Sequence, residues 1–336
     1  MNLRLFRVFM ALLVCPLLLA TGCSTNRATG NQSFTAFMSE EEERQVGAQE
    51  HPKILQEFGS EYGGPQLRAY VSNIGKALAA VSEVPGLPYT FTVLNDSKVN
   101  AFALPGGYVY ITRGLLALAE NEAEMAGVLA HEIGHITARH TAQRHSTAAA
   151  ANIGLTILGV IGSAVGVPTG VGQAVSLGAQ AAVQGYSREQ ELEADMLGVR
   201  YMTRLGYSPD GMTTFFRKMN AHSLLEARIA GQDGVSHNIM STHPRTEDRI
   251  AQAIKLAKTK NIRNPLIERA AYLTQIDGLV FGDDAAQGIR KGRRFIHPEL
   301  GIEFMVPPGF TMFNSAKALE AVGPNKSKII FDMANP

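Results

Sequence analysis

The sequence predicts an α+β fold, with a mainly helical domain, a small β-sheet beside one central helix, and a β-rich C-terminal region. Apolar residues at helical spacing indicate helices in several stretches of residues 39–260. Short alternating runs rich in Thr, Phe, Val and Tyr indicate strands just before the central helix. Residues 262–336 combine short apolar runs with Gly, Pro and Asp turns, and we expect them to form a β-rich, incomplete domain.

The composition is that of a globular protein with balanced charge. Of the 336 residues, 45% are hydrophobic and 18% are charged, and the formal net charge is +1. Because a basic surplus is absent, nucleic acid is not expected as a partner. The chain is long enough to bury a sizeable core.

Residues 1–22 are typical of a lipoprotein signal peptide. Two arginines precede an uncharged apolar run over residues 8–20, which is too short for an ordinary membrane span. The letters LATGC then end at Cys23 and resemble a lipoprotein box, in which the chain is cut before the cysteine and the cysteine acquires lipid. Ser24 follows, as in lipoproteins sorted to the outer membrane. A plain secretory signal is the alternative.

This interpretation places the mature chain in the periplasm, anchored through lipid on Cys23 to a membrane, with the outer membrane as the expected one. Residues 23–38 are small and polar, and we expect them to form a tether. The other cysteine, Cys15, is removed with the signal, so no thiol remains for a disulfide or a zinc–thiolate site. A metal site must therefore use His and carboxylate ligands.

The first helices have clear boundaries. Ser39 is followed by four Glu residues, which predicts a capped helix running to about residue 58. A Gly-Gly-Pro break precedes a second amphipathic helix over residues 65–81.

Three short strands are expected at residues 89–94, 100–103 and 108–112. The edge of such a sheet can pair with an extended peptide backbone. The candidate substrate-binding strand is Asn100, Ala101, Phe102 and Ala103; a purely structural hairpin is the alternative.

The central helix carries the letters HEIGH, which fit the pattern HExxH. His131 and His135 are four residues apart, so they share a helix face and can bind one metal ion. Glu132 lies beside the open metal position, where a general base acting on water is needed. Asn121 predicts the helix start, and Met125, Val128, Leu129 and Ile133 predict its buried face.

A catalytic zinc usually has a third protein ligand. In the extended pattern HExxHxxGxxH, a third His supplies this ligand. That pattern is excluded here, because Ala138 and Thr141 occupy the positions of its Gly and its last His. A second helix offers Glu191 and Asp195, which are four apart; one can ligate while the other accepts the ring N–H of a ligating His. Glu189 and Glu193 are expected to point away from the metal. An ordinary acidic helix face is the alternative.

The chain resembles peptidase family M48 from about residue 40 to 258. The resemblance is carried, in order, by NAFALPGG at 100–107, TRGLL at 112–116, HEIGH at 131–135, SREQELEAD at 187–195 and STHP at 241–244 followed by Arg249-Ile250. It implies a zincin-like metalloprotease domain over 39–260. One Zn²⁺ per chain would be held by His131, His135 and Glu191, with Glu132 as the base.

Supporting roles are expected for residues near these motifs, and the role of His243 is the one that the resemblance implies. Asp195 is expected to orient a ligating His, and Arg188 is a candidate for supporting the cleft. His243 is a candidate fourth ligand that displaces water, and a helix cap or a substrate contact is its alternative. The remaining histidines, His140 among them, are expected to be structural or exposed, and Arg249 is expected to face solvent on a helix over 244–258.

The family implies a zinc-dependent endopeptidase of the cell envelope that acts on misfolded or unassembled envelope proteins. A non-proteolytic assembly factor using the same cleft is the main alternative. The apolar segment 147–183 could form two packed helices or a plug over the cleft, with membrane contact as a third interpretation.

Overall fold

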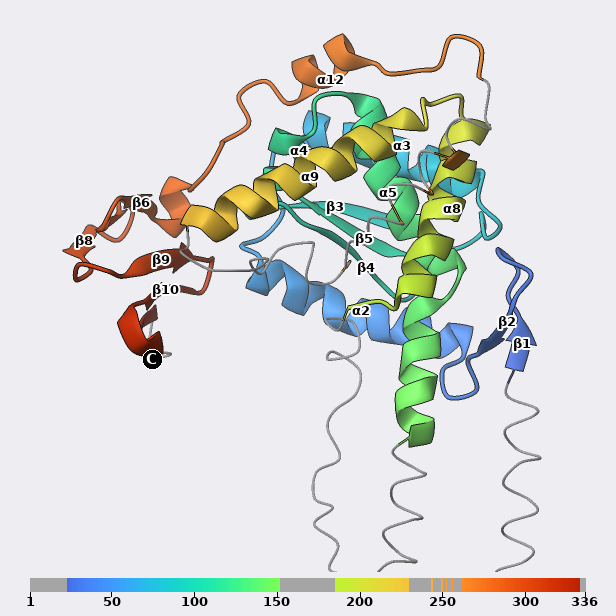
Figure 1. Cartoon of the computed structure of the whole chain (residues 1–336), viewed down its shortest axis with the longest axis horizontal. Coiled ribbons are helices and arrows are strands. Elements are labelled where there is room, and N and C mark those ends of the chain that lie inside the picture. Colours follow the sequence, from blue (N-terminus) through green and yellow to red (C-terminus); the bar gives the residue numbers. More distant parts are fainter. Residues whose placement is uncertain are drawn as a thin grey trace, which may run out of the picture.

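The computed structural model describes residues 23–151, 185–229 and 262–332, together with residues 243, 249, 252, 255 and 256. The predicted signal peptide and residues 152–183 of the apolar segment lie outside this part of the chain. Figure 1 shows the arrangement, in which helices surround a small sheet and the C-terminal strands lie to one side.

The helices are α2 (Glu40–Glu57), α3 (Pro65–Ala80), α4 (Arg113–Leu118), α5 (Glu122–Thr137), α8 (Arg188–Arg204), α9 (Asp210–Ile229) and α12 (Arg269–Gln275). The first strands are β1 (Cys23–Thr25), β2 (Gln32–Phe34), β3 (Thr90–Leu94), β4 (Ala101–Leu104) and β5 (Tyr108–Thr112). The later strands are β6 (Ile289–Lys291), β7 (Arg294–His297), β8 (Ile302–Met305), β9 (Thr311–Asn314), β10 (Ala318–Val322) and β11 (Lys328–Asp332). The predicted α+β fold is confirmed.

The helix starts follow their sequence signals. Ser39 caps α2 in a capping box with Glu42. Asn121 caps α5 by accepting a hydrogen bond from the amide of Glu124, which secures the start of the helix that carries HEIGH.

The small sheet has the order β3-β5-β4, with β5 parallel to β3 and antiparallel to β4. Successive side chains of each strand point to opposite faces of the sheet, so they pack in two separate hydrophobic clusters. Val109 and Ile111 join the main core with α3 and α5, whereas Tyr108 and Tyr110 pack on the opposite side with residues of α2. Because β4 is an edge strand and contacts α5, one sheet edge lies beside the central helix.

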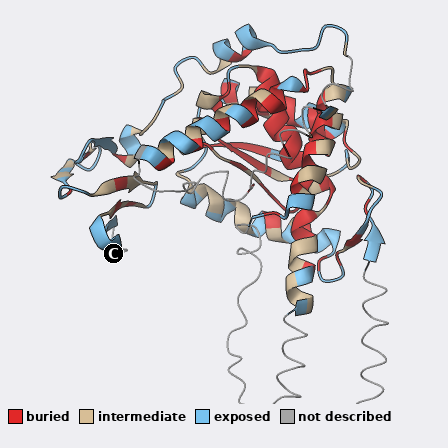
Figure 2. Cartoon of the chain, in the orientation of Figure 1, coloured by how far each residue is buried: buried red, intermediate tan, exposed pale blue. Residues whose placement is uncertain are grey.

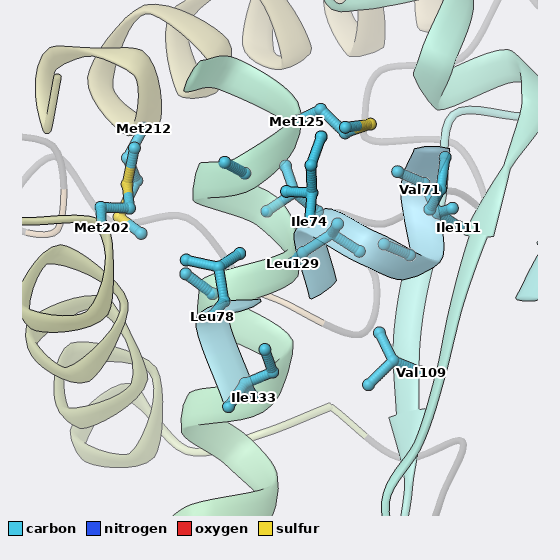
Figure 3. Packing of buried hydrophobic residues seen from close by; sticks show 14 of the residues in the cluster. Val71, Ile74, Leu78, Val109, Ile111, Met125, Leu129, Ile133, Met202 and Met212 are labelled. Atoms are coloured by element: carbon cyan, nitrogen blue, oxygen red, sulfur yellow. The ribbon is translucent and has the colours of Figure 1, made fainter. Parts of the chain in front are cut away.

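The main core is built around α5, as the concentration of buried residues in Figure 2 shows. Side chains of α3 meet those of α5 there, among them Leu78 and Leu129 (Figure 3). Helix α8 approaches α5 closely because Gly134 lacks a side chain: a Cβ atom at this position would lie 2.9 Å from the carbonyl oxygen of Ala194. This close approach brings the HEIGH segment next to α8.

Residues 23–38 differ from the expected tether. Strands β1 and β2 pair as an antiparallel hairpin. The side chain of Asn26 donates a 2.7 Å hydrogen bond to the carbonyl of Ala138, just beyond the end of α5, and Ala28 is buried in the main core. The segment folds onto the domain because it adds a hydrogen bond to a helix-end carbonyl, which Gln143 also contacts, and because it buries an apolar residue.

The C-terminal region consists of two antiparallel sheets, ordered β6-β7-β8 and β11-β10-β9. They share a small apolar cluster that includes Phe295, Val306 and Met312. The expected β-rich character is therefore confirmed. Among the described residues, we find no helix with the length and apolar character needed to cross a membrane.

Candidate metal centre

Four buried side chains from three parts of the chain converge on one point: His131 and His135 from α5, Glu191 from α8, and His243. Each offers one ligand atom, and these atoms all lie within 4.8 Å of one another. The Nε2 atoms of His131 and His135 are 3.0 Å apart. Oε1 of Glu191 lies 3.3 Å from Nε2 of His135 and 2.9 Å from Nδ1 of His243.

These distances fit a tetrahedral metal ion. Zinc with bonds of about 2.1 Å separates neighbouring ligand atoms by roughly 3.4 Å. Nδ1 of His243 lies 3.2 Å from Nε2 of His131, close to the same value. Nitrogen and carboxylate donors are also the ligands that zinc prefers. The residues present can therefore hold a zinc ion.

Glu132 is fully buried beside this group. Within the described part of the chain, neither of its carboxylate oxygens has a hydrogen-bond partner. Oε1 of Glu132 lies 3.6 Å from Nε2 of His243. Burial raises the pKa of Glu132 above its ordinary value. A buried carboxylate without a hydrogen-bond donor is costly, which is typical of a group that meets its donor only during a reaction.

His131 is backed by Asp195, as expected for one of the two carboxylates on α8. Nδ1 of His131 lies 2.9 Å from Oδ1 of Asp195. Asp195 also accepts two hydrogen bonds from Arg249, and Arg249 forms an ion pair with Glu191. Contact with both carboxylates buries Arg249, so the expectation that it faces solvent is wrong. Arg188 is exposed at the start of α8, and the contact with these carboxylates belongs to Arg249.

His135 has a different neighbour, which the sequence did not reveal. Its Nδ1 lies 2.8 Å from Nδ1 of His140, and Nε2 of His140 lies 2.9 Å from Oε2 of Glu193. Glu193 points away from the metal ligands, as expected, yet it contacts the site through His140. Tyr186 stacks on the ring of His135 at a centroid distance of 3.7 Å.

Burial and the opposite charges packed together shift the pKa values of the cluster. Burial alone would raise the pKa of Glu191, but His243, His135 and His131 hold it well below its usual range. Burial lowers the pKa of His135 well below its ordinary value, which keeps the ring neutral and able to ligate. Burial also opposes charge on His243, but the carboxylates of Glu191 and Glu132 outweigh it and raise the pKa of His243.

The expected substrate-binding strand lies at the sheet edge. Ala101 and Ala103 belong to β4 and are buried, and Phe102 stacks on Tyr110. The side-chain oxygen of Asn100 is buried without a hydrogen-bond partner among the described residues. A cavity of about 250 Å³ opens between β4, the β1–β2 hairpin and α5, and His135 and Tyr186 form part of its wall.

Two histidines one turn apart on a buried helix, a glutamate beside them and a carboxylate from a second helix define a metallopeptidase site of the gluzincin type. The family model of peptidase family M48 matches residues 65–257. Because this match covers more than half of the chain, the chain belongs to peptidase family M48, a family of zinc metallopeptidases.

Curated relatives agree with this assignment. The chain is 33% identical to the beta-barrel assembly-enhancing protease of Escherichia coli K12 over 196 residues, which is 56% of this chain and 38% of the relative. It is 31% identical to the protein of the same name in Yersinia pestis over 195 residues, with the same coverage. It is 31% identical to the mitochondrial metalloendopeptidase OMA1 of Schizosaccharomyces pombe over 204 residues, 58% of this chain and 56% of the relative. The chain thus spans well under two thirds of these relatives.

Proposed function

We propose that this chain is a zinc-dependent endopeptidase of the bacterial cell envelope that hydrolyses misfolded or unassembled envelope proteins. The observation that carries the proposal is the buried carboxylate of Glu132, which accepts no hydrogen bond from the described residues and lies beside the cluster of His131, His135 and Glu191. One zinc ion per chain is the proposed cofactor. The fit of these residues to zinc supports this choice.

The location and substrate class are supported by separate observations. The lipoprotein-like sequence ending at Cys23 favours an anchored protein outside the cytoplasm, in the periplasm and on the outer membrane. Cys23 is exposed, as a lipid-bearing residue must be. Bacterial relatives named beta-barrel assembly-enhancing protease favour envelope proteins as substrates.

In this proposal the chain's own residues divide the chemistry among them. Zinc, when bound by His131, His135 and Glu191, supplies a Lewis acid that activates water and polarises the scissile carbonyl. Glu132 accepts the proton of the attacking water and delivers it to the leaving amine. The pKa of Glu132, which burial raises, makes its carboxylate a stronger base than an ordinary carboxylate.

The sheet edge supplies the position for the substrate. An extended peptide can add a strand to the edge of β4 that no described strand occupies, through main-chain hydrogen bonds that do not depend on substrate sequence. Because β4 contacts α5, such a strand would run past HEIGH. Unfolded segments offer extended backbone, whereas folded proteins do not, which favours unfolded or unassembled substrates.

The test compares the full chain with its Glu132→Gln variant. We expect both to bind one zinc per chain, measured by elemental analysis, because Glu132 is not a ligand. We expect hydrolysis of unfolded casein to fall by at least about a hundredfold in the variant, because base catalysis is lost. The exposed Glu189 supplies the control, and Glu189→Gln should cleave casein at the normal rate.

Equal casein hydrolysis by the wild type and Glu132→Gln would remove Glu132 from the mechanism. Zinc binding with no hydrolysis in any form, combined with an intact envelope-assembly phenotype in Glu132→Gln, would favour the non-proteolytic assembly factor.

A further inference from the structure

The imidazole rings of the two metal-binding histidines on α5 contact different kinds of side chain. The ring of His131 lies against the carboxylate of Asp195. The ring of His135 lies against another imidazole, that of His140, which is completely buried. Because a histidine pair can share only one proton between two facing nitrogens, this contact constrains where both protons sit.

The proton positions follow from the metal-binding role of His135. Its Nε2 faces the other ligand atoms and must offer a lone pair, so its proton is on Nδ1. The facing Nδ1 of His140 must then accept that proton in a hydrogen bond. The proton of His140 is therefore on Nε2, from which it is donated to Glu193 at 2.9 Å.

Glu193 is itself held in place. Its second oxygen accepts a 2.9 Å hydrogen bond from the side chain of Asn31, which directly precedes β2. A carboxylate can only accept here, so it selects the His140 tautomer with hydrogen on Nε2. If Nδ1 of His140 carried the hydrogen instead, it would face the N–H of His135, and two donors would meet without an acceptor.

The backbone turn that places His140 beside His135 requires an unfavourable conformation at Arg139. The chain turns at Ala138 and Arg139 before a new helix starts at His140, and Arg139 has φ +57°, in the left-handed region that favours glycine. The Arg139 side chain is held by Glu43 and by the carbonyl of Met38. Strain of this kind persists where the surrounding structure enforces it, often at functional sites.

We propose that His140 and Glu193 are positioning residues that fix the tautomer and the ring orientation of the metal ligand His135. This inference rests on the proposed zinc site and not on the proposed substrates. Partners of this kind contribute about 10–100-fold to metal affinity or activity.

The test uses zinc affinity and histidine tautomers of the full chain. In Glu193→Leu, we expect zinc to bind about 10–100-fold more weakly in competition with a chelator. Glu193→Gln should recover part of this loss, because its amide oxygen can still accept from His140. Glu189→Leu, on the same helix and exposed, is the matched control and should bind zinc normally.

In ¹⁵N NMR spectra of the zinc-loaded wild type, His140 should carry its proton on Nε2, and Glu193→Leu should lose this preference.

A double variant separates positioning from general destabilisation. His140→Phe should weaken zinc binding by a similar factor, and adding Glu193→Leu should cause no further loss, because both act along one path. Additive losses, or a Glu193→Leu variant with unchanged zinc affinity and an unchanged His140 tautomer, would overturn the inference while leaving the proposed function intact. A wild type that binds no zinc would overturn both.

Discussion

Arg249 holds Asp195 through two parallel hydrogen bonds, from Nε to Oδ2 at 2.8 Å and from Nη2 to Oδ1 at 2.7 Å. The same guanidinium forms an ion pair with Glu191. One buried cation therefore contacts both Glu191 and Asp195, the two α8 carboxylates that lie at the metal-binding histidines. Only an arginine offers planar donors for both at once.

Replacing Arg249 should be strongly destabilising. Arg249→Met leaves two buried carboxylates without their cation, and we expect the free energy of unfolding of the metal-free protein to fall by about 3–5 kcal/mol. In Arg249→Lys, the free energy of unfolding should fall less, because the positive charge remains, but the paired hydrogen bonds to Asp195 are still lost. Urea unfolding measures both, with the exposed Arg188→Met as control. A metal-free Arg249→Met protein as stable as the wild type would contradict the assignment.

Glu191 should be required for zinc, whereas its exposed neighbour Glu189 should not. We expect Glu191→Ala to lower zinc occupancy after dialysis to well under one per chain, because a ligand is removed. Glu189→Ala should keep full occupancy, since residue 189 lies on another face of α8. Elemental analysis of the dialysed proteins decides between them, and full zinc in Glu191→Ala would exclude it from the ligand set.

His243 should restrain the enzyme at rest. A catalytic zinc needs an open coordination position, and His243 occupies the fourth corner of the cluster. We therefore expect His243→Ala to cleave unfolded casein faster than the wild type. His222→Ala, a partly exposed histidine on α9, is the control. Normal zinc content with unchanged or slower cleavage in His243→Ala would mean that His243 contacts substrate or supports the fold.

Cys23 should carry the lipid. Cys23→Ser is expected to lose labelling by radioactive palmitate and to remain uncleaved or be released from the membrane. Cys15→Ser removes the other cysteine and should label normally. Unchanged mature mass and membrane fractionation in Cys23→Ser would reject the lipoprotein interpretation.

Local signals predicted the framework of the site well. Ser39 and Asn121 fixed helix starts because capping depends on residues within one turn. The spacing of His131 and His135 placed both rings on one face, since four residues make about one turn. The same spacing argument placed Glu191 and Asp195 on one face, and the family resemblance chose Glu191 as the ligand. The helix starts and the shared faces depend only on neighbours in the chain.

The missed contacts depend on tertiary packing. Arg249 reaches Asp195 across 54 positions of sequence, so its charge alone suggested a solvated residue. His140 would point away from His135 on a continuous helix, but the turn at Arg139 brings it back. The single available clue was that His140 and Glu193 both lie near metal-binding motifs. The hairpin over residues 23–34 was missed because Asn26 finds its partner 112 residues away.

The hydrogen bond between Asn26 and the end of α5 also limits how far the catalytic domain can lie from a lipid on Cys23. Cys23 precedes Asn26 by three residues, which span at most about 10 Å when fully extended. A lipid on Cys23 would therefore hold the catalytic domain against the bilayer with almost no slack. If Cys23 carries the proposed lipid, we expect the protease to work at a nearly fixed height and to cleave proteins held near the membrane surface before proteins that diffuse freely.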